Sequence, residues 1–200
     1  MIPVVSKLLA SVILHGLIET REEQAGFRPG RGCIDQIFTL RQLLEQRHIY
    51  RRPTVVVFLD IRAAFDSVDR TALWQCLHRL GVPEKYISVL RAIYSQTSGR
   101  VRVYGKLSSS FGISSGVRKG CPISPFLFNS VIDDVLHKAL SGLQDCGVEL
   151  LPGSRVSDLE YADDVALLGD STQALQSALE RLAIEASRYR CISDHRNVKF

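Results

Sequence analysis

A short acidic segment constrains the fold of this chain more than any other feature. Residues 161–164 read Tyr-Ala-Asp-Asp, and apolar residues follow as far as Leu168. This pattern predicts two buried strands joined by a tight hairpin, with Asp163 and Asp164 at its tip. Asp is disfavoured inside strands and frequent in turns. The two carboxylates therefore indicate either a solvated turn or a functional site, and the pattern alone leaves both open.

Another predicted strand also ends in a carboxylate. Residues 54–60 are β-branched and apolar without alternation and end in Asp60, which predicts a strand buried on both faces. A carboxylate in that position is costly unless it is paired, hydrogen-bonded or bound to a metal. Asp66 follows on the way into a helix that Asp69 could cap and Gly81 could end. Asp60 and Asp66 form a second acidic site.

Helical periodicity and glycine punctuation account for much of the remaining chain. Helices are predicted at residues 4–18, 34–50, 83–96, 122–140 and 172–189. Residues 99–113 alternate arginine with valine and then turn, which predicts an antiparallel pair with one basic face. That face either lies along a phosphate backbone or is charged for solubility. An edge strand is expected at 147–150, and no repeat or linker divides the chain.

Composition sets broad limits on function. The chain is 46% hydrophobic and 23% charged, with a formal net charge of +4, which permits a polyanionic partner without requiring one. Its five cysteines contain no CxxC pair, so reduced thiols and an intracellular location are expected. The apolar run at 2–18 is too polar for a membrane span, so no membrane partner is expected.

Two glycine-bounded loops carry paired cations. Residues 24–32 present Arg28 and Arg31, and residues 116–125 present basic side chains just before a predicted helix. Guanidinium groups, backbone N–H groups and helix N-termini all bind anions, whereas solvated basic turns look the same in sequence.

Mg(II) prefers carboxylate oxygens, and two such ions stabilise both the attacking and the leaving oxygen in phosphoryl transfer. If the strands are neighbours, Asp60, Asp163 and Asp164 converge into such a site.

These segments resemble, in order and spacing, the reverse transcriptases of non-LTR retrotransposons. Residues 24–31 look like the fingers motif, 58–68 like the first palm motif, 120–129 like the second, and 161–164 like the polymerase signature. The resemblance covers nearly the whole chain. It implies an α+β fold, a right-hand polymerase palm with an antiparallel sheet backed by helices and with partial fingers. Fingers-like and connecting segments would be 1–53 and 83–118, and the palm 54–82 and 119–189.

The resemblance also implies an activity, RNA-directed DNA polymerisation by two-metal transfer from a dNTP to a primer 3′-hydroxyl. The partners would be an RNA template, a DNA primer and dNTPs, and the cofactor two Mg(II) ions for which Mn(II) substitutes. Asp60, Asp163, Asp164 and the backbone of Ile61 would hold the metal. The nucleotide would be bound by Arg28, Phe65, Gly120, Pro122, Tyr161 and Ala162. Arg31, Lys119 and Ser124 would contact template or primer, and Phe65 would exclude a 2′-hydroxyl or, alternatively, only pack in the core.

The chain departs from the family pattern at two places. The second palm motif usually reads RQGCP, but Lys119 replaces the glutamine, so the acceptor of an amide is lost and impaired activity is expected. Residues 190–200 are too polar for the expected apolar strand, which suggests a reading-frame change near 190. The family has a lysine in this region that could protonate pyrophosphate. Lys199 then lies near the position of that lysine but not at it. A thumb, the first part of the fingers and an endonuclease domain are expected to be absent.

Two other functions remain open on sequence grounds. The first is a catalytically inactive remnant that binds nucleic acid or another partner, which Lys119 and the tail favour and the acidic residues oppose. The second is an RNA-templated RNA polymerase or another two-metal nucleotidyltransferase, which a bulky Phe65 opposes because it disfavours ribonucleotides.

Overall fold

A computed structural model of the chain describes residues 23–61, 64–143, 146–151, 153–189 and 198–199. The helix predicted at 4–18 lies outside these residues. The helices are α2 (Cys33–Ile49), α3 (Ala64–Ser67), α4 (Arg70–Arg79), α5 (Glu84–Ser95), α6 (Ser124–Leu140) and α7 (Thr172–Tyr189). The strands are β1 (Val55–Asp60), β2 (Ser98–Gly99), β3 (Arg102–Val103), β4 (Lys106–Leu107), β5 (Phe111–Gly112), β6 (Val148–Leu151), β7 (Ser154–Val156), β8 (Asp158–Tyr161), β9 (Asp164–Gly169) and β10 (Val198–Lys199).

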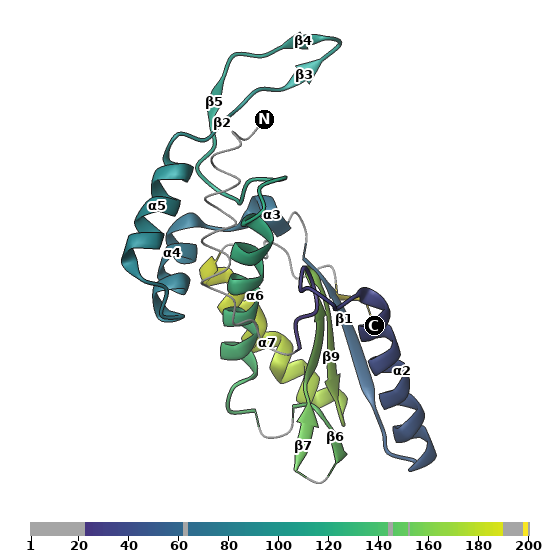
Figure 1. Cartoon of the computed structure of the whole chain (residues 1–200). Coiled ribbons are helices and arrows are strands. Elements are labelled where there is room, and N and C mark those ends of the chain that lie inside the picture. The colour runs from purple at the N-terminus through teal and green to yellow at the C-terminus, as the bar shows by residue number, and fades with distance from the viewer. Residues whose placement is uncertain (1–22, 62–63, 144–145, 152, 190–197, 200) are drawn as a thin grey trace.

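The centre of the fold is a four-stranded antiparallel sheet in the order β10-β1-β9-β8. Its face towards α6 and α7 forms the larger core, to which Val57, Val165 and Leu167 contribute. Its other face packs on α2 through a smaller cluster that includes Leu43 and Leu168. Figure 1 shows α2 along one side of the sheet and α6 and α7 on the other. The α+β class and the helix-backed antiparallel sheet are therefore confirmed.

Local sequence signals fix several element boundaries. Asp69 caps α4 by accepting a hydrogen bond from the Ala72 N–H at 2.9 Å, and Gly81 follows the helix with φ +79°. The helices predicted at 83–96 and 172–189 are confirmed within a residue or two as α5 and α7. Pro125 lies in the first turn of α6, where a missing N–H costs nothing.

Two expectations need correction. The strand at 54–60 is not buried on both faces, because α2 leaves one end of the sheet uncovered; Phe58 is 56% exposed, and Asp60 beside it is exposed. The tail is not free of strand, because Val198–Lys199 pairs with Phe58 and Leu59 at the sheet edge. Two residues are too short to leave an alternating pattern, and the open edge of β1 supplies their partners. The antiparallel pairing predicted within residues 99–113 is confirmed by the β2–β5 and β3–β4 pairs, and this hairpin is exposed on both faces, with Val103 54% exposed.

No helix in the described part of the chain is long and apolar enough to cross a membrane.

Candidate polymerase active site

The β8–β9 hairpin presents its acidic residues through a two-residue loop. The tight hairpin predicted from the sequence is confirmed, but its tip is one residue earlier than expected: Tyr161 pairs with Asp164, so Ala162 and Asp163 make the turn and Asp164 begins β9. Ala162 has φ +58°, a left-handed conformation that ordinarily favours glycine at the first loop position of a type II′ turn. A non-glycine residue in this conformation costs about 1 kcal/mol, so the surrounding structure has to hold the turn in place.

The register of the sheet brings Asp60 to this hairpin. Asp60 lies directly opposite Asp164 in the β1–β9 pair, and residues opposite each other in an antiparallel pair project from the same face. Asp60 and Asp164 are exposed, and Asp163 is half-buried. We refer to Asp60, Asp163 and Asp164 as the acidic triad. The structure thus places all three at the same end of neighbouring strands.

Mutual repulsion is visible in the electrostatics of the acidic triad. Burial raises the pKa of the Asp164 carboxyl, and the negative charges of Asp163 and then Asp60 raise it further. Among the described residues, no member of the triad forms an ion pair. A cation bound between these carboxylates would remove this repulsion.

The donor set of the acidic triad fits a divalent metal ion. Carboxylate oxygens are the ligands that hard cations such as Mg(II) and Mn(II) take, and two of the three are open to solvent. Within the described ranges, however, no three His, Cys, Asp or Glu side chains already converge as a complete ligand set. The triad therefore has the right chemistry and position, and its side chains must adjust to coordinate a shared ion. The Ile61 side chain is buried, which leaves its backbone as the part that can contribute.

A segment from the fingers motif is hydrogen-bonded to the hairpin. Gln24 is fully buried and bonds the backbone of Ala162 and the carboxylate of Glu160, while Gly26 lies against Ala162. Asn129 of α6 donates to the Gly26 carbonyl at 2.8 Å. No local sequence pattern assigns these residues a role. Their position within two family motifs is the only sequence signal that could have singled them out.

The arginines of the fingers loop are only partly covered. Arg28 is half-buried and Arg31 exposed, and Phe27 precedes them with φ +58° and 60% exposure. The Phe27 ring meets the edge of Phe65 at a centroid distance of 6.3 Å. The loop thus contacts α3 through Phe65, and nucleotide or template contacts by the two arginines stay predictions.

Phe65 itself is held by an aromatic stack. Its ring lies 5.0 Å from that of Phe128 on α6, at an interplanar angle of 18°, and the side chain is half-buried. Both the packing role and the gating role given to Phe65 are compatible with this fixed, partly open position. The nearby turn residues differ in access, since Tyr161 is half-buried and the Ala162 side chain is buried.

The loop before α6 exposes some of its predicted contact residues and buries another. Gly120, with φ +79° and open space where a Cβ would lie, is exposed, as is Pro122. Ser124 is fully buried and shares a hydrogen bond with the Tyr94 hydroxyl at 3.1 Å, so its side chain is not accessible to a template here. Lys119 forms an exposed ion pair with Asp66 at 2.7 Å. Asp66 is thus paired with the ammonium group of Lys119 and lies outside the triad.

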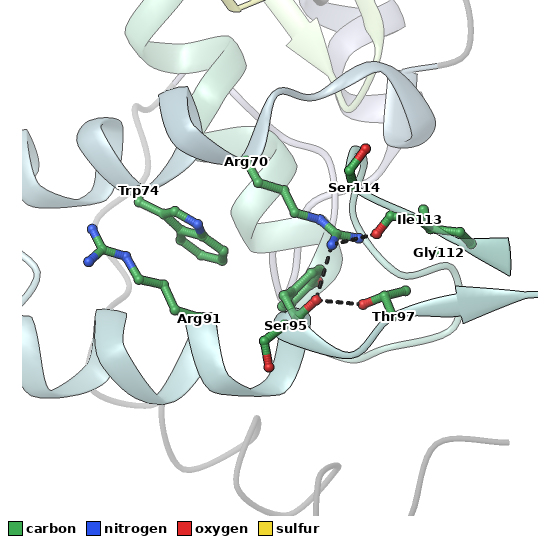
Figure 2. A pocket seen from close by; sticks show the side chains of 9 residues that line it. Arg70, Trp74, Arg91, Ser95, Thr97, Gly112, Ile113 and Ser114 are labelled. Carbon is green, nitrogen blue, oxygen red and sulfur yellow. Dashed lines mark hydrogen bonds between the residues drawn. The ribbon is translucent and has the colours of Figure 1, made fainter.

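Two pockets adjoin these elements. One, of about 240 Å³, lies between α2 and the uncovered end of the sheet and includes Phe58 and Asp164 in its lining. The other is shown in Figure 2, where Arg70 reaches from α4 towards Thr97 and Ile113 while Trp74 and Arg91 line the facing helices. Arg70 donates to the carbonyls of Tyr94, Ile113, Ser115 and Gly116. Its donors are largely used, so it anchors the hairpin and the loop rather than offering an anion site.

Comparisons with known proteins agree with this geometry. The profile of the family described as "Reverse transcriptase (RNA-dependent DNA polymerase)" matches residues 1–194. The "Retrovirus-related Pol polyprotein from type-1 retrotransposable element R2" of Nasonia vitripennis is 29% identical over 168 residues, covering 84% of this chain and 16% of the relative. The protein of the same description from Popillia japonica is 30% identical over 178 residues, covering 85% and 24%. The chain thus spans about a quarter or less of these relatives.

A solved structure supports the fold alone. The telomerase of Candida tropicalis, in complex with the TWJ fragment of telomeric RNA, superposes with a TM-score of 0.67 over 97% of this chain and 32% of that chain, at 12% identity. The likeness is consistent with the polymerase palm expected from the sequence. The chain therefore belongs to the reverse transcriptase family, and the relatives it matches come from non-LTR retrotransposons.

Proposed function

We propose that this chain is the catalytic palm of an RNA-directed DNA polymerase, which extends a DNA primer along an RNA template with dNTPs. One observation carries the proposal: Asp60 lies directly opposite Asp164 in the sheet, with Asp163 on the adjoining turn. The chain belongs to the reverse transcriptase family, and nucleotidyl transfer by two metal ions needs carboxylates that lie together, as on these neighbouring strands.

The acidic triad would hold two divalent cations, Mg(II) in the cell with Mn(II) as a substitute, together with the backbone of Ile61. Bound there, the cations stabilise negative charge on the attacking and leaving oxygens. In the reaction the primer 3′-hydroxyl loses its proton to solvent, and its oxygen bonds to the α-phosphorus of the dNTP. The bond from that phosphorus to the bridging oxygen breaks, and pyrophosphate leaves. Asp60, Asp163 and Asp164 orient this step by fixing where the charge is neutralised.

The nucleotide would lie between the hairpin and the loops around it. Arg28 contacts the triphosphate, Tyr161 and Ala162 flank the base and primer end, and Gly120 and Pro122 shape the pocket. Phe65 acts as the gate against a 2′-hydroxyl, and support comes from its stack on Phe128, which keeps a half-exposed ring in one place. We expect a Phe65→Ala variant to gain ribonucleotide incorporation relative to the unchanged chain.

Template and primer would be held by exposed cations. Arg31 and Lys119 are exposed beside the proposed pocket, and the hairpin of residues 99–113 adds Arg100 before β3, Arg102 in β3 and Lys106 in β4. Support for a nucleic-acid partner comes from these side chains and the net charge of +4. Ser124 is not part of this proposal, because its side chain is buried and hydrogen-bonded to the buried Tyr94 hydroxyl.

The test is extension of a labelled DNA primer on an RNA template with dNTPs and either Mg(II) or Mn(II). The chain is compared with Asp163→Asn and with the same chain fused to the segment that follows the palm in an R2 relative. We expect extension by the fused chain at least and a loss of about 100-fold or more in Asp163→Asn. No extension by either form would reject the polymerase.

A nucleic-acid-binding module without turnover is the second candidate. It is favoured by Lys119, which stands where the family motif usually has glutamine and forms an ion pair with Asp66. This candidate predicts salt-dependent binding of the primer–template duplex, equal in the unchanged chain and in Asp163→Asn, with no extension by the fused chain.

A further inference from the structure

We infer that Gln24 is a positioning residue for the Ala162–Asp163 turn, which we call the catalytic turn. It acts by holding Ala162 in its left-handed conformation. The inference rests on the proposed function for its kinetic part and on the structure alone for its mechanical part. Gln24, Gly26 and Asn129 together are called the turn brace.

The Gln24 amide satisfies both backbone polar groups of one turn residue. Its Oε1 accepts from the Ala162 N–H at 2.8 Å, and its Nε2 reaches the Ala162 carbonyl at 3.4 Å and the Glu160 carboxylate at 2.9 Å. Only a side chain with both a donor and an acceptor does this. Because Gln24 and Ala162 are both buried, water does not replace the amide at the Ala162 N–H and carbonyl when the side chain is removed.

The amide is itself fixed in place. Gln24 Oε1 also accepts from the Gly26 N–H at 2.7 Å, and the backbone of Ala25 donates to the Glu160 carbonyl at 2.9 Å. Asn129 then holds the Gly26 carbonyl from α6, the most buried helix of the larger core. The turn is therefore connected through hydrogen bonds to the interior, which is how a rigid scaffold positions a site to within a fraction of an ångström.

Close packing makes the connection specific. A Cβ placed on Gly26 would lie 2.2 Å from the Ala162 nitrogen and 2.8 Å from Gln24 Oε1. The backbone at 26 thus approaches the turn as closely as glycine permits. Ala162 has a strained φ of +58°, and the turn brace provides the contacts that stabilise this conformation.

The test combines amide exchange at Ala162 with kinetics of the primer-extending chain. In Gln24→Ala we expect the Ala162 amide to exchange about tenfold faster or more, since its acceptor is lost. We expect kcat to fall by about tenfold or more, with a smaller change in KM for the dNTP, because displaced carboxylates impair the chemical step. Unchanged exchange at Ala162 would overturn the inference.

Gln36→Ala is the matched control. Gln36 Nε2 donates to the Glu23 and Glu160 carbonyls, so it joins the same two segments without touching the turn. We expect faster exchange around residue 160 but little change at Ala162 and in kcat. If Gln36→Ala accelerates Ala162 exchange and lowers kcat as much as Gln24→Ala, general loosening explains both and the inference fails.

A second variant separates bracing from mere stability. Glycine adopts positive φ without strain, so Ala162→Gly should restore part of the lost kcat in the Gln24→Ala background, by about threefold or more. Equal effects of Ala162→Gly in both backgrounds would contradict the inference. The exchange measurement needs no turnover, so an inactive chain rejects the proposed function while Ala162 exchange still judges the turn brace.

Discussion

The Ala162–Asp163 turn and the β3–β4 hairpin are both short β-turn structures, yet they are supported in opposite ways. At the turn, Gln24 and Glu160 are fully buried and hydrogen-bonded to each other, whereas Tyr104 at the hairpin tip is fully exposed. Figure 1 shows β3 and β4 projecting beyond the helices. An isolated two-stranded hairpin is only marginally stable in water.

Under the proposed function, this difference would separate a catalytic region from a nucleic-acid-binding region. Carboxylates that must neutralise charge at fixed points need a rigid support, and the turn brace provides it. A surface that follows a nucleic-acid backbone gains from adapting to its partner, and the hairpin is free to do so. Changes at the turn should therefore alter catalysis, and changes at the hairpin should alter binding.

The largest contrast is expected from adding one methyl group in each region. Gly26→Ala pushes a Cβ into the Ala162 backbone, so we expect about 2 kcal/mol of destabilisation and a loss of primer extension of about 100-fold. Gly112 of β5 has open space around its Cβ position and no positive φ, so Gly112→Ala should change unfolding free energy by about 0.5 kcal/mol or less. Chemical denaturation and extension assays measure both. Equal tolerance at the two positions would remove the contrast.

The hairpin should show its role in binding. Replacing Arg100, Arg102 and Lys106 with serine should weaken primer–template binding by about tenfold at low salt and reduce the slope of log affinity against log salt by about 2. Extension by the bound complex should be kept. Arg188→Ser, which removes a cation paired with Glu185, is the control and should leave the slope nearly unchanged. A triple variant with the original salt slope would show that the hairpin is charged only for solubility.

A smaller gain is expected at Lys119. Lys119→Gln restores the amide usual at this position of the family motif, so extension should rise by about threefold or more. Stability should change by about 0.5 kcal/mol or less, since both partners of the Lys119–Asp66 pair are exposed. Asp66→Asn breaks the same ion pair but leaves lysine, without an amide, at position 119. If both variants raise extension equally, release of the ion pair and not the amide is responsible.

The smallest effect concerns pH. Because the pKa of Asp164 is raised in the folded state, its contribution to stability is present below the unfolded pKa and is lost as pH rises through the folded pKa. Asp164→Asn should therefore be more stable than the unchanged chain at pH 7 without divalent cations, by about 0.3 kcal/mol after solvent screening, and nearly equal at pH 3. Thermal unfolding across this range measures the difference. A variant less stable at pH 7 would contradict the repulsion.

Local signals predicted the elements well, and long-range contacts explain what they missed. The Asp69 cap, Gly81 and the amphipathic pattern of α7 act within a few residues and could be read directly. Gln24 and Ala162 are 138 positions apart, so no local pattern connects them. The exposure of Phe58 depends on where α2 stops covering the sheet, which periodicity does not encode.

The acidic triad was predictable in part for the same reason. The turn and the end of β1 were each visible in sequence, while the pairing of Asp60 with Asp164 required the sheet order. Arg70 carried no sequence signal, because its partners are backbone carbonyls that any residue provides.

In the proposed function, Asp60, Asp163 and Asp164 act together to bind two divalent cations. The direct measurement is Mn(II) binding followed by electron paramagnetic resonance, in the presence of primer–template and a dNTP. Asp60→Asn should weaken Mn(II) binding by about tenfold or more, because one carboxylate ligand is lost. Asp66→Asn, which changes the nearby carboxylate paired with Lys119, should bind Mn(II) as the unchanged chain does. Equal Mn(II) affinity in Asp60→Asn and the unchanged chain would show that Asp60 is not a ligand of a site shared with Asp163 and Asp164.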